Sequence, residues 1–228
     1  RVPADLHVLQ YPNYLLPLLV LASGRAQRGR VGWLVFTTTL AAFSSYYLAA
    51  MAGVLLGVEA VLALPTAGWR PALRIGAAAL PGFLVLAVCS LPYLAQIDAA
   101  PPDAATLATV GAVLQPRLLD PGDTLFGVGW AAAALGIIGM LAPALRWRRP
   151  DVTWYRWVTL VLVGLLFAAG PTLTVRGIAV PLPAAALSHT PLRALRALAR
   201  FVILADVGVA GLAADGAALL LWWAGRFG

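Results

Sequence analysis

The residues best suited to chemistry in this sequence are three arginines in the stretch HTPLRALRALARF, residues 189–201. Arg193, Arg196 and Arg200 stand three and four residues apart, so in a helix their side chains share one narrow face. A guanidinium group has five donors in a rigid fork and can grip a phosphate through two of them at once. The spacing therefore predicts a site for a phosphate or pyrophosphate head group.

The residues around these arginines predict a short amphipathic helix. Thr190 suits an N-cap and Pro191 suits the first helical position, while the helix N-terminus places a partial positive charge close to His189. The opposite face is predicted to carry leucines, namely Leu192, Leu195 and Leu198. Spacing alone leaves two interpretations open: a lipid-phosphate site, or arginines that anchor an interfacial helix among lipid head groups.

The composition places these residues at a membrane. Hydrophobic residues make up 61% of the chain and charged residues 11%, and the mean hydropathy is +0.87. A soluble domain carries about 25% charged residues, so the sequence predicts a multi-pass protein of the cell membrane, inner or plasma. The net charge of +7 comes from arginines clustered between apolar runs, which is typical of a topology signal and argues against nucleic-acid binding.

The positive charges of the loops predict the side of the membrane on which each loop lies. The arginine-bearing loops 25–30, 70–74 and 146–156 are predicted on the cytoplasmic side. The apolar run between the first two must then cross an even number of times, so a break is expected at 43–47 on the outer side. The result is an all-α bundle of about seven spans: 8–23, two short helices within 31–64, 75–95, 126–145, 155–169 and 201–223.

Two external loops, 96–127 and 170–200, are expected to carry short interfacial helices, the first of them at 104–114. No internal repeat is visible, so residues 1–228 are predicted to form one transmembrane domain. Because the chain begins at Arg1 without an initiator Met, we expect an incomplete C-terminal fragment whose missing N-terminal helices would cover its buried faces.

This topology puts Arg176 and the three clustered arginines on the outer face, against the positive-inside bias. Acidic residues inside apolar spans are costly and therefore functional candidates, here Glu59, Asp206 and Asp215. Asp206, about one and a half turns past Arg200, is a candidate to pair with an arginine near the outer surface, whereas water or cytoplasmic arginines are expected to neutralise Glu59 and Asp215. His7 is predicted on the outer side as well, so His7 and Asp206 are candidate polar supports for the arginine site.

Metal and cofactor chemistry finds little support in the residues. Two histidines and a single cysteine lack metal-ligand spacing, and Cys89 is predicted to be a small buried hydrophobe. Nucleotide-binding and nucleophile motifs are absent from the sequence. No metal site and no cofactor are expected from this chain, although a divalent metal held by an upstream region stays open.

Several stretches, taken in order, resemble the C-terminal half of bacterial and archaeal membrane proteins with GT-C glycosyltransferase architecture. They are LHVLQYPNYLLPLLVLA, AAFSSYYLAAMAGVLL, LLDPGDTLFG, GPTLTVRGIAVPLP and PLRALRALARFVILADVGVAGLA. The resemblance covers most of the chain and implies transfer of a sugar from a polyprenyl-phosphate donor on the outer side of the membrane.

The same resemblance implies that the catalytic Asp or Glu lies in an early external loop, upstream of this sequence. The catalytic residue is therefore unknown, while Arg176, His189, Arg193, Arg196 and Arg200 would bind the lipid phosphate. Two other hypotheses remain: a transporter or lipid flippase, which usually shows internal repeats, and a non-catalytic assembly protein of the membrane. The expected partners are membrane lipids, the polyprenyl-phosphate-linked sugar and the missing helices of the same chain.

Overall fold

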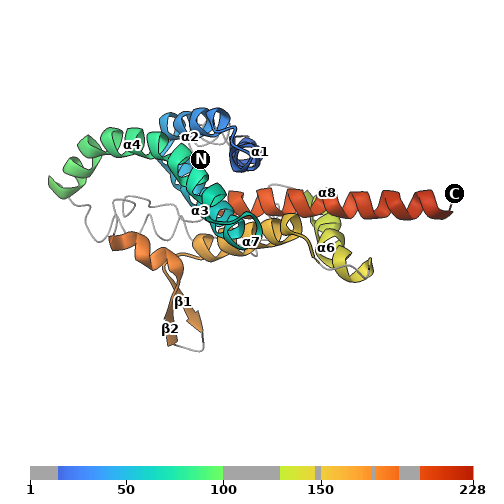
Figure 1. The fold of residues 1–228 in the computed structure, drawn as a ribbon. Coiled ribbons are helices and arrows are strands. Elements are labelled where there is room, and N and C mark those ends of the chain that lie inside the picture. Colours follow the sequence, from blue (N-terminus) through green and yellow to red (C-terminus); the bar gives the residue numbers. More distant parts are fainter. Residues whose placement is uncertain (1–14, 100–128, 147–149, 176–177, 190–200, 228) are drawn as a thin grey trace. The chain divides into compact units, whose positions relative to one another are not determined.

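The computed structural model describes residues 15–99, 129–146, 150–175, 178–189 and 201–227. The described residues contain seven α-helices, one β-hairpin and one 3-10 helix (Figure 1). They belong to two compact units: unit 1 is Arg1–Leu114 with Leu187–Ala197, and unit 2 is Gln115–Ala186 with Leu198–Gly228. The predicted surface helix at 104–114 and the arginine helix at 191–200 lie outside the described residues.

Unit 1 is built from α1 (Leu15–Gln27), α2 (Gly32–Ser44), α3 (Tyr46–Ala67) and α4 (Trp69–Ala99). Thr38 of α2 and Gly53 of α3 meet the adjacent residues Gly82 and Phe83 of α4, so α3 runs opposite to both α2 and α4. Gly82 of α4 lies against the backbone of Thr38 in α2, where an added Cβ would come within 2.8 Å of the Thr38 carbonyl carbon. An added Cβ on Gly53 of α3 would lie 3.1 Å from the Phe83 ring. Unit 1 therefore depends on small residues where its helices approach each other.

The predicted break within 43–47 is confirmed. Helix α2 ends at Ser44 and α3 begins at Tyr46, with Ser45 between them in an extended conformation, φ −169° and ψ 138°. The Ser45 amide still donates to the carbonyl of Ala41 at 3.2 Å, so only one residue leaves the helical conformation. A single extended residue is enough to reverse the chain between two packed helices.

Two arginine-bearing loops of unit 1 meet at one end, as expected if they share a side of the membrane. Arg74 Nη1 donates to the carbonyl of Gln27 at 3.2 Å, joining the start of α4 to the end of α1. Gly29, which follows in the α1–α2 turn, has φ +89° and faces the same guanidinium. The loops 25–30 and 70–74 are therefore neighbours in space.

Unit 2 consists of α6 (Gly129–Leu145), α7 (Val152–Ala168) and α8 (Val202–Phe227), with α8 packed against both others. Glycines make these contacts close. A Cβ on Gly139 of α6 would collide with the carbonyl oxygen of Leu212, and one on Gly216 of α8 with that of Leu135. Gly164 of α7 meets the backbone of Ala205 in the same way. Small-residue contacts of this kind are typical of membrane helices, which lack a hydrophobic driving force between them.

Contacts along α8 set the directions of its neighbours. Gly136 of α6 faces Val209, and Arg146 just beyond α6 lies over the Trp222 ring, so α6 runs parallel to α8. On α7, Trp157 contacts Gly211 and the Phe167 ring stacks on that of Phe201 at 5.2 Å, so α7 runs antiparallel to α8. These directions agree with the predicted order of three successive crossings.

A β-hairpin stands where a loop with a surface helix was predicted. Strands β1 (Thr172–Val175) and β2 (Ile178–Pro181) pair antiparallel, with Val175 opposite Ile178, and η3 (Pro183–His189) follows as a 3-10 helix. The all-α prediction is therefore wrong in this segment. The sequence carries the signal, because TLTV and IAVP are β-branched runs separated by two residues that include a glycine.

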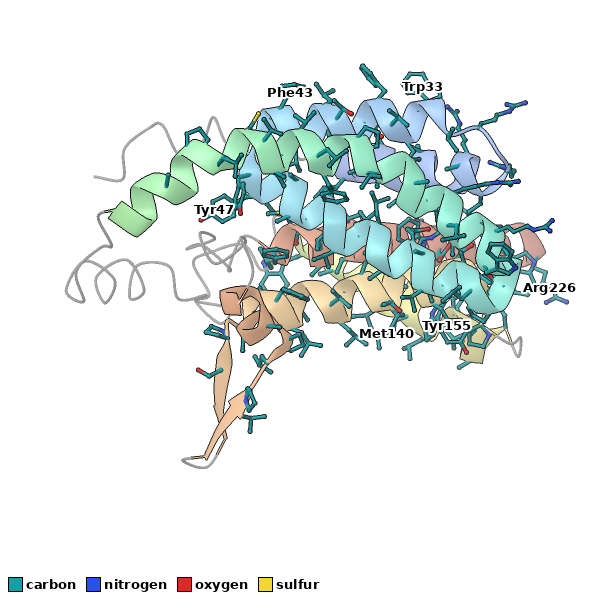
Figure 2. The ribbon with its side chains drawn as sticks, turned by 60° about the vertical axis from the view of Figure 1, so that its left-hand side comes forward. Trp33, Phe43, Tyr47, Met140, Tyr155 and Arg226 are labelled. Atoms are coloured by element: carbon teal, nitrogen blue, oxygen red, sulfur yellow. The ribbon has the colours of Figure 1, made fainter. Side chains whose placement is uncertain are left out.

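Among the described residues, three helices are long and apolar enough to cross a membrane: Tyr46–Ala67, Trp69–Cys89 and Val202–Arg226. The other apolar helices have 17 residues or fewer, and the 13 residues of α2 span about 20 Å against roughly 30 Å of hydrocarbon. The helical membrane class is thus supported, while the seven crossings remain a prediction. Trp33 and Phe43 of α2 point away from unit 1 and are 56% and 68% exposed, as lipid-facing aromatic residues would be (Figure 2).

The prediction for Cys89 is wrong, because its side chain is exposed. Thr38 lies level with Gly82, so the last residue of α2, Ser44, comes level with about position 88 of α4. Cys89 therefore sits where α4 begins to run beyond the end of α2.

Candidate functional site

Most residues of the predicted lipid-phosphate site lie outside the described residues. These are Arg176, Arg193, Arg196 and Arg200, together with the predicted support His7. His189 is the last residue of η3. Among the candidates, only Asp206 has a described side chain, so the structure informs the site through the elements on either side of the arginines.

The start of α8 directly follows the arginine stretch in the sequence. Phe201 directly follows Arg200; it is fully buried and stacks on Phe167 near the end of α7. The β-hairpin begins a few residues after α7, and its base is closed by the Leu182 amide donating to the Pro171 carbonyl at 2.9 Å. The start of α8 and the base of the hairpin therefore share one end of unit 2, which we call the Phe201 end.

Asp206 lies about one and a half turns into α8 from the Phe201 end. It neighbours Ala205, whose backbone packs on Gly164. Its Oδ1 is buried and has no hydrogen-bond partner among the described residues. A buried carboxylate oxygen without a partner is costly in apolar surroundings, which keeps Asp206 a candidate for polar support. Its pairing with an arginine near the outer surface stays a prediction.

A second polar cluster lies at the opposite end of unit 2, which we call the Arg146 end. A cavity of about 290 Å³ is lined by the charged side chains Arg146, Asp151 and Asp215 together with Trp154, Ala142, Pro143 and Pro150. The sequence analysis did not assign a site here. The available signal was an arginine and an aspartate in one short loop and a further aspartate inside an apolar helix, but their proximity depends on how α8 packs.

Local hydrogen bonds hold the walls of this cavity. Asp151 is the N-cap of α7, where its Oδ1 accepts from the Trp154 amide at 2.8 Å. The Trp154 indole Nε1 donates to the carbonyl of Met140 at 3.2 Å, which ties α7 to α6. Met140, Tyr155 and Arg226 all lie toward this end of the unit (Figure 2). These two bonds fix the start of α7 and join it to α6.

Two of the described arginines at this end, Arg146 and Arg226, lie over the Trp222 ring. The Arg146 guanidinium carbon lies 5.9 Å from the ring centroid and that of Arg226 lies 4.6 Å from it. The Nε of Arg146 is buried and has no hydrogen-bond partner among the described residues. Cation–π contact stabilises the charge but leaves the guanidinium donors available to an acceptor.

Asp215 joins this cluster from α8. It lies close enough to Arg146 for attraction and to Asp151 for repulsion, so two carboxylates share one nearby guanidinium. The neighbouring arginine belongs to the loop predicted on the cytoplasmic side, as expected for Asp215. Glu59 does not belong to this cluster, because it lies in unit 1. There it is 1% exposed and interacts with other groups of the protein.

The chemistry within reach of the described residues is the binding of charged groups. Among these residues, no group of three or more His, Cys, Asp and Glu side chains comes together to hold a metal ion. The chain matches no protein-family model, no curated protein sequence and no solved structure. The function of this chain is therefore inferred from its residues and their packing.

Proposed function

We propose that this chain crosses the cell membrane seven times and forms the C-terminal membrane part of a glycosyltransferase. The enzyme would move a sugar from a polyprenyl-phosphate donor at the outer membrane face. The observation that carries the proposal is the sequence spacing of Arg193, Arg196 and Arg200 directly before a helix that is long enough to span the bilayer.

The packing at the Phe201 end supports this assignment. Because Phe201 is buried against Phe167, the first turn of α8 is fixed to α7. We infer that the arginines, which directly precede this helix in the sequence, meet phosphates of the outer leaflet.

Each residue has a distinct role in the proposal. Arg193, Arg196 and Arg200 bind the donor phosphate, while Arg176 and His189 contribute further contacts at its edge. Asp206 and His7 orient the arginines through hydrogen bonds. The catalytic acid or base belongs to a region preceding this sequence, in keeping with the GT-C resemblance.

The test compares alanine substitutions in the complete native protein, prepared in membranes with a labelled polyprenyl-phosphate sugar. We expect Arg196→Ala and Arg200→Ala each to lower sugar transfer by about tenfold or more, because each removes a charge-assisted hydrogen bond of about 1.5–3 kcal/mol. Arg70→Ala is the control, since Arg70 is an exposed arginine of unit 1. Size-exclusion chromatography in detergent checks that all variants fold.

Two results would contradict the proposal. Normal transfer by both variants would show that the arginines only anchor an interfacial helix. Substrate uptake into sealed vesicles, with the lipid-linked sugar left intact, would instead favour a transporter.

A further inference from the structure

The cavity at the Arg146 end combines both signs of charge in a small space. Arg146 supplies a guanidinium whose Nε has no described partner, while Asp151 and Asp215 supply two carboxylates. A purely anionic ligand would be repelled by the two carboxylates, and a simple cation would leave the guanidinium unused. The lining is therefore complementary to a group that carries a phosphate and a cation together.

The depth of the cavity points to a lipid. Asp215 precedes Trp222 by seven residues, which is about 10 Å along a helix. Tryptophans near the ends of spanning helices mark the membrane–water interface, so Asp215 lies on the membrane side of that level, while Arg146 lies over the Trp222 ring itself. Figure 1 shows α8 continuing past the end of α6, and the Arg146 side chain reaches from that end toward the Trp222 ring.

Apolar surface adjoins the polar cavity on the same helices. Leu221 of α8 is 74% exposed, and Leu141 and Leu145 of α6 are exposed as well. Acyl chains can lie along such surface while the head group enters the cavity. A volume of about 290 Å³ accommodates a small head group rather than a whole lipid.

We propose that this cavity binds the head group of phosphatidylethanolamine, from the leaflet predicted to face the cytoplasm. The guanidinium of Arg146 holds the phosphate, with Arg226 beside it on the Trp222 ring. The primary ammonium donates to the carboxylates of Asp215 and Asp151. Phosphatidylcholine lacks ammonium N–H donors and is bulkier, while phosphatidylglycerol lacks the cation, so the site discriminates against both.

Lipid retention measures this preference directly. The protein is reconstituted in nanodiscs containing equal amounts of the three phospholipids, and retained lipid is counted by native mass spectrometry after extraction. We expect about tenfold more phosphatidylethanolamine than either competitor, which corresponds to about 1.4 kcal/mol. Asp215→Asn should abolish the preference for phosphatidylethanolamine over phosphatidylcholine, and Arg146→Gln should lower retention of both lipids.

Matched variants separate binding from folding. Asp151→Asn removes one carboxylate charge while an asparagine still caps α7, so the preference should fall with the helix intact. Arg70→Gln is the control, because Arg70 lies 5.7 Å over the Trp69 ring in unit 1, as Arg146 lies over Trp222. Near-ultraviolet circular dichroism verifies the packing of each variant.

Equal retention of all three lipids by the native protein would overturn the proposal. A preference for phosphatidylglycerol would overturn it too, by showing that the arginines alone bind anionic lipid. These readouts do not involve the arginines before α8, so they stand apart from the test of sugar transfer.

Discussion

At the residue scale, Asp151 serves two physical purposes at once. Its Oδ1 caps α7 by accepting from the Trp154 amide, and its carboxylate lines the cavity that also holds Asp215. Capping requires only an acceptor oxygen, whereas recognition of an ammonium group gains from the negative charge. The two purposes can therefore be separated by substitution.

Asp151→Ala removes the cap and should lower the free energy of unfolding by about 1 kcal/mol, whereas Asp151→Asn should leave it nearly unchanged. In a detergent thermal scan the alanine variant should melt about 2–4 °C below the native protein. If alanine and asparagine lower the melting temperature equally, the charge rather than the cap stabilises this end of α7.

At the element scale, α8 is the centre of unit 2 because glycines let two helices approach its backbone. Gly139 and Gly216 meet the backbone of the facing helix, while Gly225 near the end of α8 has open space around it. The loss of stability on changing a glycine to alanine should therefore depend on whether that glycine contacts a neighbouring helix.

Gly216→Ala should destabilise unit 2 by about 1–3 kcal/mol, because the added methyl group forces α6 away from α8. Gly225→Ala is the matched control and should cause no loss, since alanine favours helix. Thermal unfolding in detergent measures both. Equal stability of the two variants would mean that α6 and α8 are not packed this closely.

At the scale of the whole molecule, the arginines among the described residues of unit 1 lie at one end of its helices. Arg74 bonds the chain next to loop 25–30 at one end, whereas Ser45 reverses the chain at the other. A membrane across this unit would place the two ends on opposite sides, with the arginines inside.

Single cysteines introduced at Arg28, Arg70 and Ser44, in a Cys89→Ser background, test this arrangement in intact cells. An impermeant maleimide added outside should label the Ser44→Cys protein, and the other two should react only after the cells are opened. Labelling of all three positions from outside would contradict the orientation. Cys89 must be replaced first because it is exposed.

The sequence by itself determined the helical membrane class, the approximate helix positions and the chain reversal near Ser45. These properties depend on local composition: apolar length, the spacing of arginines, and polar residues between apolar runs. The meeting of loops 25–30 and 70–74 followed from the same charge bias. The sequence also carries a local signal for the hairpin at 172–181, namely its two β-branched runs. The segment was nevertheless predicted as a loop.

Only the tertiary structure decided which distant residues meet. Asp215 and Arg146 lie on separate helices, and their proximity depends on the glycines that set α8 against α6. The exposure of Cys89 likewise follows from how far α4 runs beyond α2. Hydropathy and charge fix where a helix forms, but the face that it turns to a neighbour depends on packing across the whole unit, which no local pattern contains.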